Sequence, residues 1–208
     1  MKKLIIFDMD GTLVDSSITL VNAINHVRSN LLLEPMSEDN ILSKLNDHTI
    51  NSSKYFYEAD SFKAEHEVWF SEYYKDNHKR ELRLYSGVKE LLDELKVKGF
   101  KLAIATNAYR ISTNQSLIYL DIKECFDAVA CSDEVRKGKP YPDMLHKILD
   151  ELNIEPKDAI FVGDGERDEV ASKNAKIDYI MVHWGYSTHK EEDAVHTIDE
   201  LKKKILEF

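Results

Sequence analysis

The sequence predicts an α/β fold in which helices cover both faces of a parallel sheet and an all-helical segment is inserted. Three observations lead to this prediction. Short apolar runs recur along the chain, amphipathic helical patterns lie between them, and one long segment near the N-terminus shows helical patterns alone.

Five apolar runs are the expected strands. They are KKLIIF ending at residue 7, KLAIAT at 101–106, DAVACS at 127–132, AIFVGD at 159–164 and YIMVHW at 179–184. Each run is short and apolar without alternation, which is typical of strands buried on both faces. Together they predict a Rossmann-like parallel sheet.

Amphipathic helices are expected between the strands. Two segments carry apolar residues at i, i+3, i+4 and i+7, which predicts one buried face on each helix. The sets are Val88, Leu91, Leu92 and Leu95, and then Leu145, Ile148, Leu149 and Leu152. Gly99 follows the first set and is suited to end that helix.

Residues 15–82 interrupt this alternation. Two helical stripes occur there, one formed by Leu20, Ile24, Val27 and Leu31, the other by Phe62, Trp69, Phe70, Tyr73 and Tyr74. No convincing strand is found, so we expect an all-helical cap at 15–82 inserted into an α/β core formed by 1–14 and 83–208. Most of the aromatic residues should form the core of the cap, and one or two should line a substrate pocket.

Composition narrows the possible functions. The 208 residues are 43% hydrophobic and 32% charged, which predicts a packed protein rather than a disordered one. Acidic residues outnumber basic ones, 38 against 28, and the net charge is −10. Because such a chain repels phosphate backbones, no nucleic-acid partner is expected. An anionic substrate would need a local positive site, which a metal ion can provide.

The chain is expected to be cytoplasmic. Asp8 ends the apolar region of MKKLIIF too early for a signal peptide. No apolar run approaches the ~20 residues of a membrane-spanning helix, so no membrane partner is expected. Cys125 and Cys131 form no CxxC pattern and are expected to be reduced thiols. The sequence makes no prediction of the oligomeric state.

Polar residues follow four of the five expected strands, at the edge of the sheet where these strands end. They are Asp8 and Asp10, Thr106 and Asn107, Lys137 and Lys139, and Asp164 and Asp168. Because ligands bind outside the carboxyl ends of the strands in an open parallel sheet, these residues are expected to converge. Four carboxylates, a hydroxyl and a lysine would then meet in one pocket.

Converging carboxylates are unfavourable unless a cation neutralises them. Oxygen ligands without histidine or cysteine favour Mg²⁺ over zinc, and phosphate oxygens can fill the remaining coordination positions. One aspartate could attack phosphorus to form an aspartyl-phosphate, while a second protonates the leaving oxygen. In FDMDGT, the spacing of two positions places Asp8 and Asp10 on the same side of an extended chain.

The segments DMDGT, IATN, GKPYPD and GDGERD occur in this order over the whole chain. The set resembles the four motifs of the haloacid dehalogenase-like hydrolases, and the segment 15–82 resembles the helical cap of one subgroup. The cap type, the DGTL continuation and VHWGY look most like phosphoglycolate phosphatases and similar small-metabolite phosphatases.

The resemblance implies a role for each of five residues. Asp8 would be the nucleophile, and Asp10 would be the general acid and then the base that activates water. Thr106 and the backbone of Asn107 would bind phosphate oxygens. Lys139 would neutralise the nucleophile and the phosphoryl group, with the nearby Lys137 as an alternative.

The same resemblance implies a magnesium site. Mg²⁺ would be held by Asp8, the main-chain carbonyl of Asp10, Asp164 and Asp168, the last directly or through water. Asp168 would also suit the first turn of a helix, because the helix dipole favours an acidic residue there.

The predicted function is a Mg²⁺-dependent phosphatase acting on a small phosphate ester, phosphoglycolate-like or a sugar phosphate, through an aspartyl-phosphate. Two alternatives stay open, a phosphosugar mutase of the same family and a non-catalytic relative that binds a phospho-ligand or a protein. The presence of Asp10 disfavours halide removal, which needs no proton donor. The cap stretch ILSKLNDHTINSSKYFYEAD matches no specificity loop of the phosphatases or mutases, so the substrate stays open.

Overall fold

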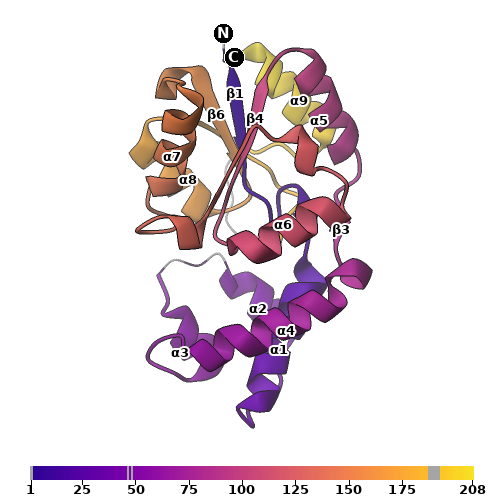
Figure 1. Cartoon of the computed structure of the whole chain (residues 1–208), viewed down its shortest axis with the longest axis vertical. Coiled ribbons are helices and arrows are strands. Elements are labelled where there is room, and N and C mark those ends of the chain that lie inside the picture. Colours follow the sequence, from indigo (N-terminus) through magenta and orange to yellow (C-terminus); the bar gives the residue numbers. More distant parts are fainter. Residues whose placement is uncertain (1, 46, 48, 187–192) are drawn as a thin grey trace.

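A five-stranded parallel sheet lies above a group of helices (Figure 1). The computed structural model describes residues 2–45, 47, 49–186 and 193–208. The strand order is β5-β4-β1-β6-β7, which places β1 at the centre. The strands are β1 (Leu4–Phe7), β4 (Lys101–Thr106), β5 (Ala128–Cys131), β6 (Ala159–Gly163) and β7 (Asp178–Met181).

The central strand explains why the sequence shows uninterrupted apolar runs. All four residues of β1 are fully buried. Phe7 lies opposite Ile104 of β4 and Val162 of β6, so both edges of β1 are paired as well. In a strand that is covered on both faces, the side chains of both faces are buried away from water. The sequence of such a strand is therefore continuously apolar.

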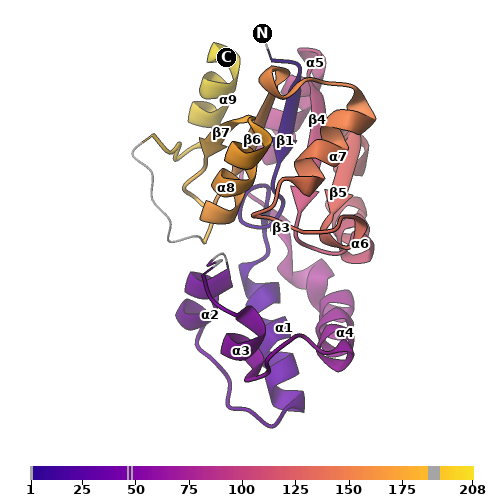
Figure 2. The same ribbon diagram turned by 90° about the vertical axis from the view of Figure 1, so that its left-hand side faces the viewer.

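Helices cover both faces of the sheet, as Figures 1 and 2 show. On one face lie α5 (Val88–Val97), α6 (Arg110–Tyr119) and α9 (Ile198–Glu207), and on the other lie α7 (Asp143–Leu152) and α8 (Glu166–Ala175). Ile5 and Phe7 pack with Leu92 of α5, whereas Leu4 and Ile6 pack with Ile148 of α7. The predicted α/β fold class is confirmed. Single turns of 3-10 helix occur at Lys123–Cys125, Ser132–Glu134 and Pro156–Asp158.

The predicted helical insertion is also present, below the carboxyl edge of the sheet. It contains α1 (Ser17–Asn30), α2 (Glu38–Leu45), α3 (Ser52–Tyr57) and α4 (Ala64–Glu81). Its helices share a core of their own, formed by Val21, Ile24, Val27, Ile41, Phe56 and Tyr57. We call these four helices and their connections the cap. Its boundaries at residues 15 and 82 stay a prediction.

Two short strands that the sequence did not predict join the cap to the rest of the chain. β2 (Val14–Asp15) and β3 (Arg83–Leu84) pair antiparallel, with Val14 opposite Leu84. Two residues are too few for a recognisable strand pattern, so this ribbon escaped the sequence analysis. It brings the chain into the cap and out again at one place, beside the end of β1.

Two smaller expectations concern the cysteines and the membrane. Cys125 and Cys131 form no disulfide with each other, since both are free. Within the part of the chain that the structure describes, none of the helices has the length and apolar character needed to cross a membrane.

Candidate active site

Three of the predicted carboxylates meet at the carboxyl edge of the sheet. Asp8 follows β1, Asp164 follows the neighbouring strand β6, and Asp168 lies in the first turn of α8. One oxygen of each lies within 4.8 Å of the others, and all three residues are buried. No other such group of potential metal ligands occurs among the described residues. Buried carboxylates this close fit a divalent cation, and their oxygens are hard ligands.

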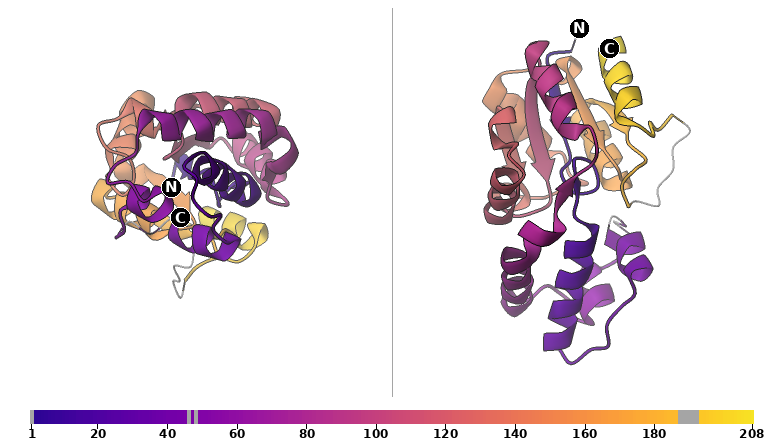
Figure 3. Two further views of the ribbon diagram at one scale, coloured as in Figure 1. Left: turned by 90° about the horizontal axis from the view of Figure 1, so that it is seen from below. Right: turned by 90° about the vertical axis from the view of Figure 1, so that its right-hand side faces the viewer.

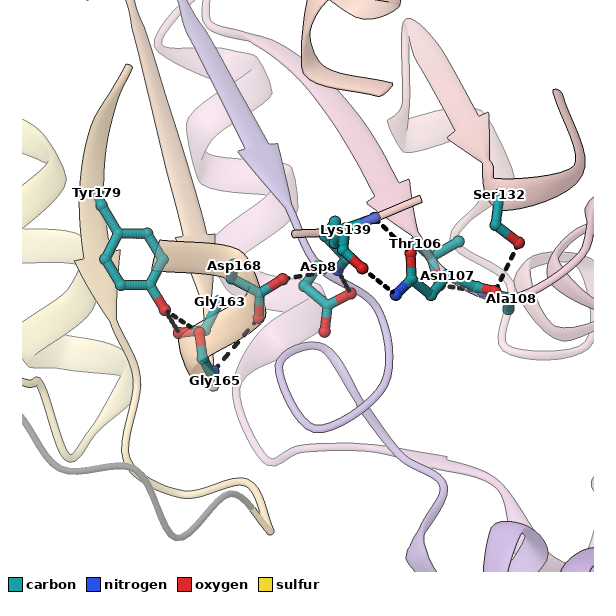
Figure 4. Close-up of polar contacts among 10 residues, drawn as sticks. All are labelled: Asp8, Thr106, Asn107, Ala108, Ser132, Lys139, Gly163, Gly165, Asp168 and Tyr179. Carbon is teal, nitrogen blue, oxygen red and sulfur yellow. Dashed lines mark hydrogen bonds and ion pairs between the residues drawn. The ribbon is translucent and has the colours of Figure 1, made fainter. Parts of the chain in front are cut away.

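Glycines make this close approach possible. Gly11 has a φ of +85°, and a Cβ atom there would collide with the carboxylate of Asp164. A Cβ atom on Gly163 would lie 2.6 Å from atoms of the Asp168 carboxylate. The Tyr179 hydroxyl donates hydrogen bonds to the carbonyls of Gly163, at 3.0 Å, and Gly165, at 3.3 Å (Figure 4). The chain between β6 and α8 is therefore fixed beside the carboxylates.

Lys139 is the lysine that reaches the acidic cluster. Its Nζ atom forms an ion pair with Oδ1 of Asp8 and lies 2.7 Å from Oδ1 of Asp168 (Figure 4). The side chain is 4% exposed, so these contacts are shielded from water. Lys137, the alternative, is exposed, and its ammonium lies 4.1 Å from the centre of the Tyr141 ring. The structure therefore brings Lys139, and not Lys137, to the predicted site.

Asn107 has a contact that the sequence did not reveal. Its side-chain amide donates to the Lys139 carbonyl at 3.1 Å, and its Oδ1 accepts from the Lys139 N–H at 2.8 Å. The main-chain carbonyl of Asn107 accepts from the Ser132 hydroxyl at 2.8 Å. The asparagine side chain thus holds the lysine backbone at the end of β4. This positioning role is additional to the predicted phosphate contact of the Asn107 backbone.

A cavity of about 570 Å³ opens between the acidic cluster and the cap. Six of the predicted site residues line it, namely Asp8, Asp10, Thr106, Asn107, Lys139 and Asp168. Asp164 does not line the cavity and is only 1% exposed. The Oγ1 of Thr106 accepts a hydrogen bond from the Ala108 N–H at 3.0 Å, which leaves the hydroxyl proton available for another acceptor.

Comparison with known proteins agrees with this geometry. Residues 5–182 match the family of haloacid dehalogenase-like hydrolases. The chain belongs to this family. A phosphoglycolate phosphatase from Aquifex aeolicus is 31% identical over 184 residues, which cover 88% of this chain and 86% of that protein. The pyrophosphatase PpaX from Bacillus cereus is 28% identical over 181 residues, covering 86% and 82%.

Solved structures of other proteins share the whole fold. A predicted phosphatase from Clostridium acetobutylicum has a TM-score of 0.85 at 26% identity, and the match covers 100% of both chains. CbbY from Rhodobacter sphaeroides, determined in complex with phosphate, has a TM-score of 0.78 at 25% identity and is matched over 94% of its length and 96% of this chain.

The electrostatics of this hydrolase site follow from burial. Burial raises the pKa of Asp8 to about 7, although the neighbouring Lys139 acts in the opposite direction. Burial also raises the pKa of Asp10, and it raises that of Asp164 well above the ordinary range. Burial alone would lower the pKa of Lys139, but the carboxylates of Asp168 and Asp8 raise it above its ordinary value. Burial therefore favours the protonated forms of Asp8 and Asp164 unless a further cation is present.

Several residues that line the cavity were not singled out in the sequence. Arg167 lies inside GDGERD, so its place in that segment could have indicated it. Its Nη2 atom donates to the main-chain oxygen of Asp47 in the cap at 3.1 Å. Tyr186 also lines the cavity, whereas the preceding His183 and Trp184 do not. Trp184 instead donates from its indole to the Thr12 carbonyl at 3.0 Å.

We predict that the affinity for Mg²⁺ falls as the pH drops below 7. Because burial raises the pKa of Asp8 to about 7, a proton occupies this carboxylate at lower pH and must leave before the cation binds. Titration calorimetry at about pH 6 and about pH 8 should show weaker binding at the lower pH, by about tenfold in total for one displaced proton with a pKa of about 7. Equal affinities without proton release would show that the cation displaces no proton from Asp8, and would contradict the assignment of this carboxylate as a metal ligand.

Proposed function

We propose that the protein is a Mg²⁺-dependent phosphatase that hydrolyses a phosphate monoester through an aspartyl-phosphate on Asp8. The observation that carries this proposal is the contact of Lys139 with both Asp8 and Asp168 at the wall of a cavity large enough for a substrate. A carboxylate, an ammonium and a set of metal ligands at one place are the requirements of phosphoryl transfer. The phosphatases among the relatives support the same reaction.

Asp8 acts as the nucleophile. One of its oxygens forms a bond to phosphorus while the bond between phosphorus and the ester oxygen breaks. Lys139 favours the ionised form of Asp8 and offers positive charge to the transferring group. Asp8, Asp164, Asp168 and the main-chain oxygen of Asp10 would hold Mg²⁺, which when bound neutralises charge on the phosphate oxygens.

Asp10 moves the protons. It lines the cavity beside Asp8, and burial raises its pKa, which favours the protonated form that the first step needs. Asp10 donates its proton to the leaving alcohol oxygen and then takes a proton from the water that attacks the phosphoryl group. Phosphate leaves, and Asp8 returns to its free carboxylate. The Thr106 hydroxyl and the Asn107 backbone bind phosphate oxygens during both steps.

The substrate class is a small phosphorylated metabolite. Phosphoglycolate and a sugar phosphate are the candidates that the sequence suggests. A non-catalytic relative is disfavoured because the nucleophile, the acid, the lysine and the metal ligands are all present in the sequence. A mutase would reveal itself by moving phosphate between positions of a sugar, whereas the proposed phosphatase releases phosphate to water.

Hydrolysis of p-nitrophenyl phosphate tests the proposal. The native protein should release p-nitrophenol in the presence of Mg²⁺, and EDTA should abolish this activity. Asp8→Asn should lower kcat by more than about a thousandfold, because the amide is not a nucleophile for phosphorus. Asp121→Asn is the matched control, since this exposed aspartate has a positive φ that asparagine also adopts. A folded native protein without activity on a broad panel of phosphate esters would contradict the proposal.

Asp10→Asn tests the proton-transfer role separately. This variant should still bind Mg²⁺ and substrate, but kcat should fall by about 10²–10⁴-fold because neither proton transfer is assisted. With p-nitrophenyl phosphate, whose leaving group needs little protonation, phosphorylated protein should accumulate and be visible as a phosphoryl adduct by intact-protein mass spectrometry. Unchanged turnover would remove Asp10 from the mechanism.

A further inference from the structure

A second cation beside the acidic cluster takes no part in the reaction described above. Arg167 lies in the first turn of α8, one position before Asp168, and it lines the cavity. Among the described residues that line the cavity, Lys75, Lys139 and Arg167 are positively charged. Lys139 contacts the carboxylates, and Lys75 is exposed. Of these three residues, Arg167 is the partly buried cation that the mechanism leaves unused.

The Arg167 side chain runs along the cavity wall from the core to the cap. Its backbone belongs to the core, and its Nη2 atom donates to the main-chain oxygen of Asp47 in the cap at 3.1 Å. The cap lies beneath the carboxyl edge of the sheet (Figure 3), with α2 below α8 (Figure 2). Asp168 on the core side and Leu45 and Ser52 on the cap side also line the cavity. The guanidinium is therefore placed at the cavity, between core and cap.

The guanidinium has donors that the protein does not use. It can donate through Nε, Nη1 and Nη2, and the main-chain oxygen of Asp47 is the acceptor found for Arg167 among the described residues. The Nε atom is buried and has no partner, so a ligand cannot reach it. The Nη1 atom also has no partner there, but it does not belong to the unpaired atoms that are buried from solvent. Nη1 therefore keeps accessible surface on a residue that lines the cavity.

The carboxylates that act on this guanidinium are engaged elsewhere. Burial lowers the pKa of Arg167, and the charges of Asp168 and Asp47 act in the opposite direction. The Asp168 carboxylate lies 2.7 Å from the ammonium of Lys139, and the Asp47 carboxylate lies 2.8 Å from that of Lys44. In the described part of the chain, neither carboxylate forms an ion pair with Arg167. Its positive charge is therefore available to an anion from outside the protein.

Much of the remaining cavity wall is apolar. It is formed by side chains of the cap, among them Leu20, Ile24, Phe56, Phe62 and Phe70. These residues come from α1, α3 and α4 and from the connection before α4. Apolar surroundings lower the local dielectric constant and thereby strengthen the attraction between a cation and an anion. A guanidinium at such a wall is suited to select a ligand by its charge.

We propose that the substrate carries a second anionic group on its leaving group, a carboxylate or a further phosphoryl group, and that Arg167 binds this group through Nη1. The proposal rests on the phosphatase activity proposed above and names its substrate class. Hydrogen bonds from a guanidinium to either group are charge-assisted and about twice as strong as neutral ones. The main-chain oxygen of Asp47 holds the guanidinium, so the cap takes part in this choice. Arg167 is then a specificity-determining residue that takes no part in the chemistry.

The test compares anionic phosphate esters with neutral analogues. One pair is phosphoglycolate and its amide, 2-amino-2-oxoethyl phosphate, and a longer pair is 4-(phosphonooxymethyl)benzoate and its amide. Ethylene glycol bisphosphate and 2-hydroxyethyl phosphate form the pair that replaces the carboxylate by a phosphoryl group. With Mg²⁺, the anionic member of at least one pair should exceed its neutral partner in kcat/KM by about tenfold or more, through a lower KM. The pair with this advantage shows which anionic group is recognised.

Two variants isolate the charge of Arg167. Arg167→Gln removes the charge, so the advantage of the anionic ester should disappear while kcat/KM for its neutral partner stays within about threefold. Arg167→Lys keeps the charge without the planar group and should retain part of the advantage. Arg80→Gln is the matched control, because Arg80 is exposed and its hydrogen bond goes to Asn77 of the same helix. Thermal unfolding shows whether each variant folds, and the lysine variant decides the question if Arg167→Gln does not fold.

The outcomes separate this inference from the function on which it rests. Failure to hydrolyse any ester, including p-nitrophenyl phosphate, would overturn the phosphatase itself. Equal kcat/KM for both members of every pair in the native protein would overturn the second anionic group and leave the phosphatase standing. If Arg167→Gln lowers kcat/KM equally for anionic and neutral esters, Arg167 only neutralises Asp168 or holds the cap. That result, or an advantage that survives the substitution, would remove Arg167 from substrate recognition.

Discussion

The site depends on one electrostatic constraint, namely that three buried carboxylates lie within 4.8 Å of one another. Such a cluster is tolerated only beside positive charge. Lys139 supplies part of it and contacts two of the three groups. Much of the local structure serves this arrangement. The strand order places β1 between β4 and β6, glycines give the carboxylates room, and the side chain of Asn107 holds the backbone of Lys139.

We assign the chemistry and the choice of substrate to different parts of the chain. The groups that we assign to phosphoryl transfer stand on the rigid carboxyl edge of the sheet, where buried strands fix their positions. The apolar side chains that line the cavity opposite these groups belong to the cap. The short ribbon of β2 and β3 joins the two parts next to Asp8 and Asp10. We therefore propose that the core provides the reaction and that the cap influences which leaving group enters.

Sequence reasoning captured the fold class, the helical insertion and the family because their signals are local. Buried parallel strands read as short apolar runs, and residues after those runs share one sheet edge. Only the structure distinguishes Lys139 from Lys137 as the lysine of the site, because both residues follow the same expected strand. The clamp by Asn107 joins residues 32 positions apart, and no local pattern reports it. The cavity wall is formed by residues of α1, α3 and α4. The sequence could predict that these residues are apolar, but it could not predict that they line one cavity beside the site. The catalytic and metal-binding roles, and the domain boundaries, stay predictions.

The central claim is that the acidic cluster takes a divalent cation and thereby makes Asp8 a receptor for a phosphoryl group. A crystal structure of the protein with Mg²⁺ and beryllofluoride, which mimics a phosphoryl group, tests it most directly. The account predicts beryllium bonded to a carboxylate oxygen of Asp8, with Mg²⁺ coordinated by Asp8 and Asp164 and Lys139 close to a fluorine atom. Beryllofluoride bound at Asp8 without any metal, or an acidic cluster that stays empty while both ions are present, would contradict it.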